Sequence, residues 1–291
     1  MSWRSAFTNS DARVLSRAQL LALGATGKTL TAAVRSCDLL RVRRDHYALP
    51  DCDPHIIEAV RVGGRLGCLS ALADYGIFVV DSRFTHVHLD PVTSRPRSPR
   101  NRFDPLSLTN RDGVQLHWTG LIDEQDGSEC RVGIRDALAQ SLGCQSEWES
   151  VASFDSALHL GLATRDEVDL VFARAPLRAK AVAGLIDPRA ESGPESILRM
   201  IVHAAGLRCE PQVSIPGVGR VDLLVEGRLV LEADSRAFHE GWRKQRADRE
   251  RDLQLARRRY LSLRPISDHI LYSAATVREA IEGLLSVSAR R

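Results

Sequence analysis

Apolar and polar positions along the last hundred residues follow the periods of helices and strands in a regular order. Apolar residues recur every three or four positions in the stretch that ends at Gly206, which predicts a helix. Runs rich in valine and leucine, separated by turns that contain glycine, predict strands. The predicted elements are a helix at 191–206, strands at 209–215, 219–225 and 228–234, a basic helix at 238–259, a strand at 260–264 and a closing helix at 274–286. This order predicts an α/β core built around one sheet, which we assign to a domain at 187–291.

The first fifty residues have a different pattern, in which two short helices precede a hairpin. Helices predicted at 16–24 and 28–40 are followed by the segment 41–50, which predicts two strands joined by a turn near Asp45. Two helices followed by a basic hairpin is the order of a winged helix-turn-helix, with the second helix as the recognition element. We therefore predict a DNA-binding domain at 1–52.

The middle of the chain, residues 53–186, mixes both kinds of element and predicts an α/β domain, so that the whole chain is α+β with three domains. Its predicted helices lie at about 54–62, 69–75, 132–143, 150–161 and 164–172, and its predicted strands at 78–80, 85–90 and 114–118. His86 and His88 share one face of a predicted strand. Two histidines by themselves do not predict a metal site, and we interpret them as structural.

Composition and charge are those of an ordinary globular protein, with 44% hydrophobic and 26% charged residues and a net charge of +3. No apolar run approaches the roughly 20 residues that a membrane helix needs, and the N-terminus does not have the pattern of a signal peptide. The six cysteines are scattered and include no CxxC pair. We expect a cytoplasmic protein with reduced thiols and find no support for a zinc site.

Basic residues gather in two places. Residues 236–264 hold ten lysines and arginines against four acids, and residues 94–102 hold four arginines and no acid. Such patches suit the phosphate backbone of DNA. The residues that we predict to contact DNA, including those of the recognition helix and hairpin, are Lys28, Thr29, Arg35, Arg43, Arg97, Arg100, Arg243, Lys244, Arg246, Arg249 and Arg251.

Three carboxylates, Asp222, Glu232 and Asp234, lie on the second and third predicted strands of the C-terminal sheet. Because side chains alternate along a strand, a two-residue loop would place Asp222 and Glu232 on opposite faces, and a three-residue loop with Gly227 in the left-handed conformation would place them on one face. We predict the three-residue loop, and a metal site also requires it, because metal ligands must converge. The opposite, apolar face then consists of Leu223, Val225, Leu229, Leu231 and Ala233.

An oxygen-rich set of this kind suits Mg²⁺ or Mn²⁺, which would activate water and neutralise charge on a phosphate. Glu195 fits a capping box that begins at Ser192 and also fits a third acid of the metal shell, and the two interpretations are compatible. His239 follows Asp234 by five residues and is a candidate general base or proton relay.

At these residues the last hundred positions resemble endonuclease-like domains related to very-short-patch-repair (Vsr) enzymes, which belong to the restriction-endonuclease-like PD-(D/E)xK superfamily. The resemblance rests on Val221-Asp222, Glu232-Ala-Asp234, His239, the motif DRERDLQL at 248–255, and Glu195 with Leu198 and Arg199 in the opening helix. It implies an αβββαβ core, Asp222 and Glu232 as metal ligands, Glu195 as a third acid and His239 as a functional histidine.

Two positions depart from that pattern. The superfamily has a lysine two residues after the glutamate, where this chain has Asp234, although the Vsr-like branch also lacks that lysine. Related domains usually continue with glycine, where this chain has Ser235. The N-terminal part is similar to the winged-helix region of AbiEi-type antitoxins, and the segments 116–118 and 154–164 extend this similarity through the middle of the chain.

These observations predict a metal-dependent DNA endonuclease that hydrolyses phosphodiester bonds, in a defence, toxin–antitoxin or repair setting that rests on analogy. The alternative is a DNA-binding regulator or antitoxin with an inactive nuclease fold, which Asp234 and Ser235 favour. A nuclease for RNA or single-stranded DNA ranks lower, because aromatic residues for base stacking make up only 5% of the chain. The expected partners are duplex or branched DNA and a second copy of the chain, with no membrane.

Overall fold

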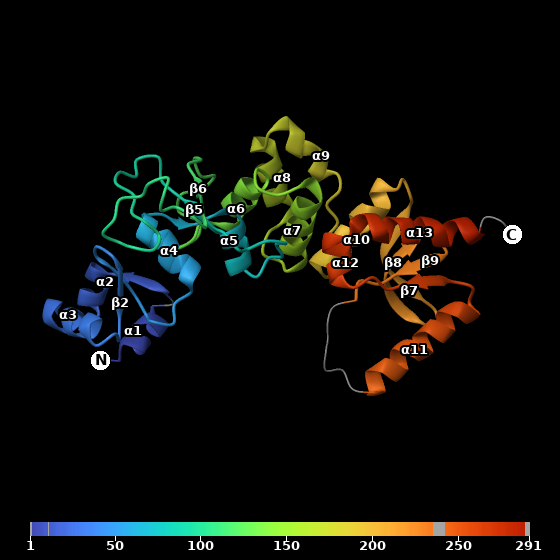
Figure 1. The fold of residues 1–291 in the computed structure, drawn as a ribbon, viewed down its shortest axis with the longest axis horizontal. Coiled ribbons are helices and arrows are strands. Elements are labelled where there is room, and N and C mark those ends of the chain that lie inside the picture. Colours follow the sequence, from blue (N-terminus) through green and yellow to red (C-terminus); the bar gives the residue numbers. More distant parts are fainter. Residues whose placement is uncertain (1, 11, 235–241, 289–291) are drawn as a thin grey trace. The chain divides into compact units, whose positions relative to one another are not determined.

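The computed structural model of the protein describes residues 2–10, 12–234 and 242–288, and its fold is α+β, as the sequence predicts (Figure 1). The chain forms two compact units. The N-terminal unit consists of residues 1–76 and 81–144, and the C-terminal unit consists of residues 77–80 and 145–291. The predicted domain boundaries at 52 and 186 stay predictions. None of the described helices is long and apolar enough to cross a bilayer.

The start of the N-terminal unit contains a small three-stranded sheet and three helices. They are α1 (Trp3–Asn9), β1 (Val14–Ser16), α2 (Arg17–Ala22), α3 (Gly27–Arg35), β2 (Leu40–Arg43) and β3 (His46–Ala48). Strand β3 pairs antiparallel with both neighbours, in the order β1-β3-β2. The two helices and the turn at Asp45 confirm the predicted order, and α1 and β1 are additions that the apolar pattern did not predict.

Capping boxes explain where the two predicted helices begin. Ser16 and Gln19 exchange side-chain and backbone hydrogen bonds at the start of α2, and Thr26 and Thr29 do the same at the start of α3. The apolar faces of these helices pack with Phe7 and Tyr47 in one buried cluster. Polar positions on the outer face of α3 are therefore left in solvent.

The rest of the N-terminal unit is built on a second three-stranded sheet, in the order β4-β5-β6. Strand β4 pairs antiparallel with β5, and β5 pairs parallel with β6. The elements are α4 (Pro54–Val62), β4 (Arg65–Leu66), α5 (Cys68–Asp74), β5 (Thr85–His88), β6 (Val114–His117) and α6 (Ile134–Ser141). Because the strands of this sheet are short, much of the unit is irregular backbone. Side chains must therefore supply hydrogen-bond partners for its polar groups.

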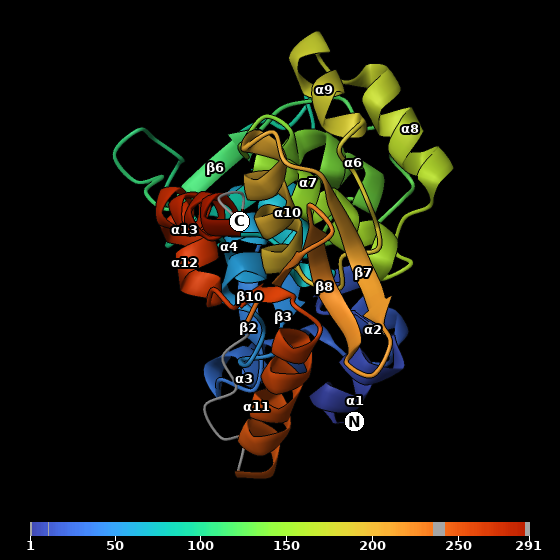
Figure 2. The same ribbon diagram turned by 90° about the vertical axis from the view of Figure 1, so that its right-hand side faces the viewer.

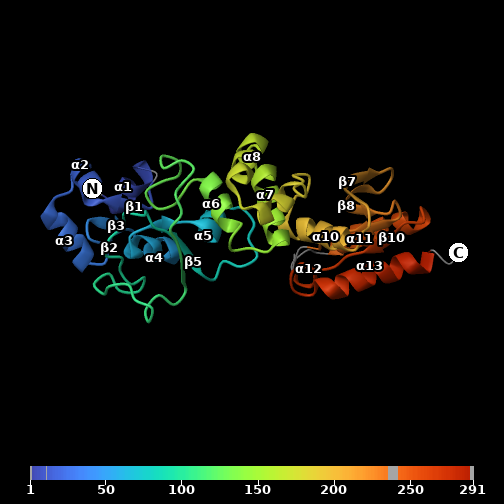
Figure 3. The same cartoon turned by 90° about the horizontal axis from the view of Figure 1, so that it is seen from above.

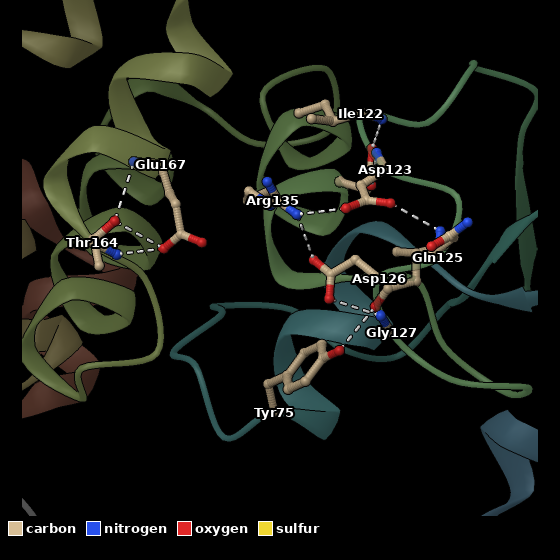
Figure 4. A network of polar contacts seen from close by, with 11 residues as sticks. Tyr75, Ile122, Asp123, Gln125, Asp126, Gly127, Arg135, Thr164 and Glu167 are labelled. Atoms are coloured by element: carbon tan, nitrogen blue, oxygen red, sulfur yellow. Dashed lines mark hydrogen bonds and ion pairs between the residues drawn. The ribbon is translucent and has the colours of Figure 1, made fainter.

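Side chains of α6 hold the irregular segment that precedes it. Figure 4 shows Arg135 beside Asp123 and Asp126, with guanidinium to carboxylate distances of 3.1 and 3.4 Å. The neighbouring carboxylate of Asp136 is buried and accepts hydrogen bonds from the backbone N–H groups of Ile122 and Asp123. One turn of helix therefore fixes a loop that has no regular structure of its own.

The predicted strand at 78–80 is wrong, because these residues lie in irregular backbone. Both polar backbone groups of Phe78 are used by side chains of α7 (Glu147–His159). Its N–H donates to Ser156 Oγ at 3.0 Å, and its carbonyl accepts from Ser153 Oγ at 2.8 Å. Phe78 therefore packs against the helical core of the C-terminal unit instead of joining a sheet.

The C-terminal unit continues after residue 145 with three helices and a 3₁₀ turn. They are α7, α8 (Arg165–Arg174), the turn at Leu177–Ala179 and α9 (Lys180–Ala183). Thr164 and Glu167 form the capping box of α8 (Figure 4). The fully buried Asp155 of α7 accepts hydrogen bonds from Arg199 and Ser196, both at 2.8 Å. Arg199 of α10 (Gly193–Ala204) therefore links this helix to α7.

The last hundred residues form the predicted four-stranded sheet. The elements are α10 (Gly193–Ala204), β7 (Cys209–Ile215), β8 (Gly219–Val225), β9 (Leu229–Leu231), α11 (Trp242–Arg257), β10 (Leu261–Leu263), α12 (Ser267–Tyr272) and α13 (Ala274–Ser288). The strand order is β10-β9-β8-β7, with β9 and β10 parallel and the other pairs antiparallel. Apart from the added α12, this is the predicted order.

Helices cover both faces of this sheet (Figure 2). On one face, α10, α12 and α13 enclose a core with Leu223, Leu229 and Leu231, and Figure 3 shows α13 running beside that layer. On the other face, Leu255 of α11 packs on Val230. The acidic hairpin residues lie on the α11 side, because they alternate with the leucines that enter the larger core.

Candidate functional site

The hairpin that carries the acids has the predicted three-residue loop. Val225 pairs with Leu229 and Leu223 with Leu231, so that residues 226–228 form the loop. Gly227 has φ of 66°, in the left-handed region. One further step of this register places Asp222 opposite Glu232, with both side chains on the face away from the leucine core. The predicted register and the predicted apolar face are confirmed.

Asp222 is a partly buried carboxylate whose negative charge is offset by few hydrogen-bond donors or positive charges. Its Oδ2 accepts a hydrogen bond from the N–H of Ala233 at 2.9 Å. Burial, followed by the negative charges of Glu195 and Glu232, raises the pKa of Asp222 to about 6, against the lowering effects of the Ala233 N–H and of Arg251. A concentration of negative charge therefore exists at this point of the sheet.

Glu232 is held by two arginines. Nη2 of Arg251 lies 2.6 Å from Oε1, and Nη2 of Arg264 lies 2.9 Å from Oε2. Burial still raises the pKa of Glu232 above its usual range, although Arg264 and Arg251 oppose this shift. Nη2 of Arg264 also lies 2.9 Å from Oδ1 of Asp252, so that one guanidinium joins the residues that follow β9 and β10 to α11.

Glu195 is buried at the start of α10, and both of its carboxylate oxygens have donors. Oε1 accepts from Ser192 Oγ at 2.8 Å, while Oε2 accepts from the N–H of Glu191 at 2.9 Å and from Gln212 Nε2 at 2.8 Å. Ser192 caps the helix as predicted, accepting from the Glu195 N–H. The capping-box prediction is wrong in one contact, because the glutamate bonds to the backbone of Glu191 and to the Ser192 hydroxyl.

The three acids do not fit a divalent cation in this arrangement. Within the described residues, Glu195, Asp222 and Glu232 do not bring three ligand oxygens within 4.8 Å of one another. The oxygens that would face an ion on Glu232 are taken by guanidinium groups, which repel a cation. The predicted Mg²⁺ or Mn²⁺ set would require Glu232 to be released first.

Asp234 does not join these acids. Its side chain is exposed, and its backbone forms an isolated parallel bridge with Ile266, with the Asp234 N–H donating to the Pro265 carbonyl. His239 lies outside the described residues, as do the side chains of Arg243 and Lys244. Arg246 and Arg249 are exposed on α11.

The predicted DNA-contacting residues of the N-terminal unit differ in their surroundings. Lys28 and Arg35 are exposed on α3, while the Thr29 hydroxyl is used in the capping box. Arg43 is only partly exposed and donates to the carbonyl of Arg61. Arg97 donates to the carbonyl of Phe103 at 2.9 Å, and Arg100 is exposed. Lys28, Arg35 and Arg100 are thus the candidates best placed to reach a partner.

A second cluster was missed in the sequence. Cys68, His86, His117 and Cys144 place four ligand atoms within 4.8 Å of one another in the N-terminal unit. The pKa of Cys144 is lowered by its hydrogen bond with Cys68 and by those with His117 and His86, while the same contact raises the pKa of Cys68. The cysteines lie 76 positions apart, which gives no spacing signal, and the only local sign was a histidine on each of two strands.

Searches with the whole chain find no matching family model and no matching curated protein.

Proposed function

We propose that the protein binds duplex DNA, with α3 as the element that enters the major groove. The order α1-β1-α2-α3-β2-β3, with the sheet order β1-β3-β2, carries this proposal. It supports a winged helix-turn-helix, in which the second helix of the pair presents its outer face and the hairpin lies beside it. Lys28 and Arg35 are exposed on that face of α3.

Basic residues of the C-terminal unit add to this binding. Arg246 and Arg249 are exposed on the described part of α11 and would attract a phosphate backbone without reading its sequence. Regulation or an antitoxin role is the setting that the resemblance of the N-terminal part implies. The nuclease-like unit is then a scaffold, because arginines hold Glu232 and the three acids do not converge.

Fluorescence anisotropy with labelled duplex DNA at several salt concentrations tests the proposal. Wild type is expected to bind with an affinity that falls steeply with salt, because bound phosphates release counterions. Arg35→Ala is expected to weaken binding and to reduce the slope of log K against log salt by about 1. Lys180→Ala is the charge-matched control, since Lys180 is exposed on α9, and it is expected to bind as wild type does.

A wild-type chain that binds no duplex DNA in low salt overturns the proposal, and an Arg35→Ala chain that binds like wild type overturns the role of α3.

Metal-dependent hydrolysis of DNA is the second candidate; it requires Arg251 and Arg264 to release Glu232, and one observation favours it. Asp222 and Glu232 face the same side of the hairpin beside the buried Glu195, where burial and negative charge raise the pKa of Asp222. Supercoiled plasmid incubated with Mg²⁺, with Mn²⁺ and with EDTA tests this activity. Cutting that needs metal and is lost in Asp222→Ala and Glu232→Ala, while the exposed-site control Glu250→Ala still cuts, supports the nuclease. Absence of cutting by wild type, or equal cutting by all variants, excludes it.

A further inference from the structure

Four side chains from four different elements meet in the N-terminal unit. Cys68 is the first residue of α5, His86 lies in β5, His117 ends β6, and Cys144 follows α6. Their ligand atoms all lie within 4.8 Å of one another. Nδ1 of His86 and Nε2 of His117 are 3.0 Å apart, and the two rings stack at 24° with centroids 5.3 Å apart. Two sulfur and two nitrogen atoms thus surround one point.

We propose that these four residues bind one zinc ion as a structural site. Two thiolates and two imidazoles form a Cys₂His₂ set, and four protein ligands complete the tetrahedral coordination that zinc prefers, which leaves no position for a substrate. Zinc bonds of about 2.0–2.3 Å would hold the ligand atoms roughly 3.3–3.8 Å apart. Ligand atoms at the 4.8 Å limit would then move together by only about 1 Å.

The backbone around the cluster is fixed by contacts that do not involve the ligand atoms. The N–H of Cys68 donates to Oε1 of Gln140 at 2.9 Å, and the N–H of His86 donates to Ser70 Oγ at 2.8 Å. The carbonyl of His117 accepts from the N–H of Leu89 at 2.8 Å. Such supporting contacts orient ligands before an ion binds.

Gln140 and Gly67 position Cys68 in particular. A methyl group on Gly67 would lie 2.6 Å from Oε1 of Gln140, so that glycine is needed for this approach. Cys68 itself has φ of 47°, in the left-handed region that a residue with a β-carbon rarely adopts. The backbone strain of this conformation therefore lies at Cys68, whose sulfur is one of the four ligand atoms.

The burial of the cluster also favours an ion. Cys68 and His86 are buried, and Cys144 is exposed, so that an ion can enter past Cys144. The sheet that carries the histidines has strands of two and four residues. Zinc bonds to residues of α5, β5 and β6 and to Cys144 after α6 would hold these segments together. They would stabilise a unit whose strands form few backbone hydrogen bonds.

Zinc analysis of the purified full chain, kept under reducing conditions, tests the proposal. Wild type is expected to carry about one zinc per chain, and cobalt in its place is expected to give the strong visible absorption of tetrahedral coordination with a thiolate charge-transfer band. Cys144→Ser should bind zinc at least about 100-fold more weakly in competition with a chelator. Cys37→Ser is the matched control, because Cys37 is also an exposed free cysteine, and it should bind as wild type does.

Thiol labelling gives a second readout that does not depend on how well a variant folds. A maleimide should label Cys144 in the zinc-free wild type and not in the zinc-loaded wild type, while Cys37 is labelled in both. The proposal is overturned if reduced wild type binds no zinc, if Cys144→Ser binds it as tightly as wild type, or if a Cys68–Cys144 disulfide forms with zinc present.

Discussion

Nη2 of Arg251 on α11 lies 2.6 Å from Oε1 of Glu232, the residue that follows β9, and this contact fastens the long basic helix to the sheet. Both side chains are less than a third exposed, at 29% and 13%. The carboxylate that the sequence assigns to a metal is therefore part of an ion-pair network. This contact decides how the C-terminal unit is interpreted, because a charge that holds a helix is not available to a cation.

A double-mutant cycle of Glu232→Gln and Arg251→Gln measures this contact. We expect a coupling of about 1–2 kcal/mol in the free energy of unfolding, since the pair is partly shielded from water and Arg264 shares the carboxylate. The exposed pair Arg165 and Asp169, 3.6 Å apart on α8, provides the control. Its coupling should stay below about 0.5 kcal/mol. Equal coupling in both pairs would contradict a structural role for the Glu232 network.

The stability of the C-terminal unit should depend on pH through Asp222. The folded-state pKa of about 6 lies above the ordinary aspartate value of 3.8, so the folded chain binds this proton more tightly than the unfolded chain does. Stability contributed by the protonated group is full below pH 3.8 and is lost as pH rises to about 6. Asn cannot be charged, so the stability of Asp222→Asn relative to wild type should increase between these pH values. The increase should be on the order of 2 kcal/mol in the free energy of unfolding.

Urea unfolding at pH 4, 5, 6 and 7 checks this expectation, with Glu250→Gln as the control because Glu250 is exposed on α11. The difference between Asp222→Asn and wild type should grow with pH, and the control should follow wild type. A difference that stays constant, or that shrinks as pH rises, would show that the folded-state pKa of Asp222 is not raised.

The loop that sets the hairpin register should be sensitive at Gly227. Its φ of 66° favours glycine, so Gly227→Ala is expected to cost about 1 kcal/mol, although no atom crowds the position. Gly184, with φ of −73°, is the matched control, and Gly184→Ala should be neutral or slightly stabilising. Thermal unfolding of the two variants beside wild type gives the comparison. If Gly227→Ala and Gly184→Ala unfold at the same temperature, the hairpin does not depend on the left-handed conformation of Gly227.

Local patterns in the sequence were sufficient to predict most of the helices and strands, and also which two acids share a face of the hairpin. Apolar period and capping residues located α2, α3, α7, α8 and the elements of the C-terminal sheet. The alternation of leucines around Gly227 fixed the parity of the loop and therefore the common face of Asp222 and Glu232. These features follow from residues close in the chain, whose side chains must divide between core and solvent.

Contacts between distant residues were decided only by the tertiary structure. The sequence does not indicate that Arg251 and Arg264 reach Glu232, because that contact requires α11 to cross the sheet face and β10 to lie beside β9. Nor does it indicate that Cys68 and Cys144 meet His86 and His117, since packing of four elements brings these atoms together. The sequence by itself determined the α+β elements and the placing of the acids, and tertiary packing determined which charges and ligands converge, because periodicity records burial and not the partner across the core.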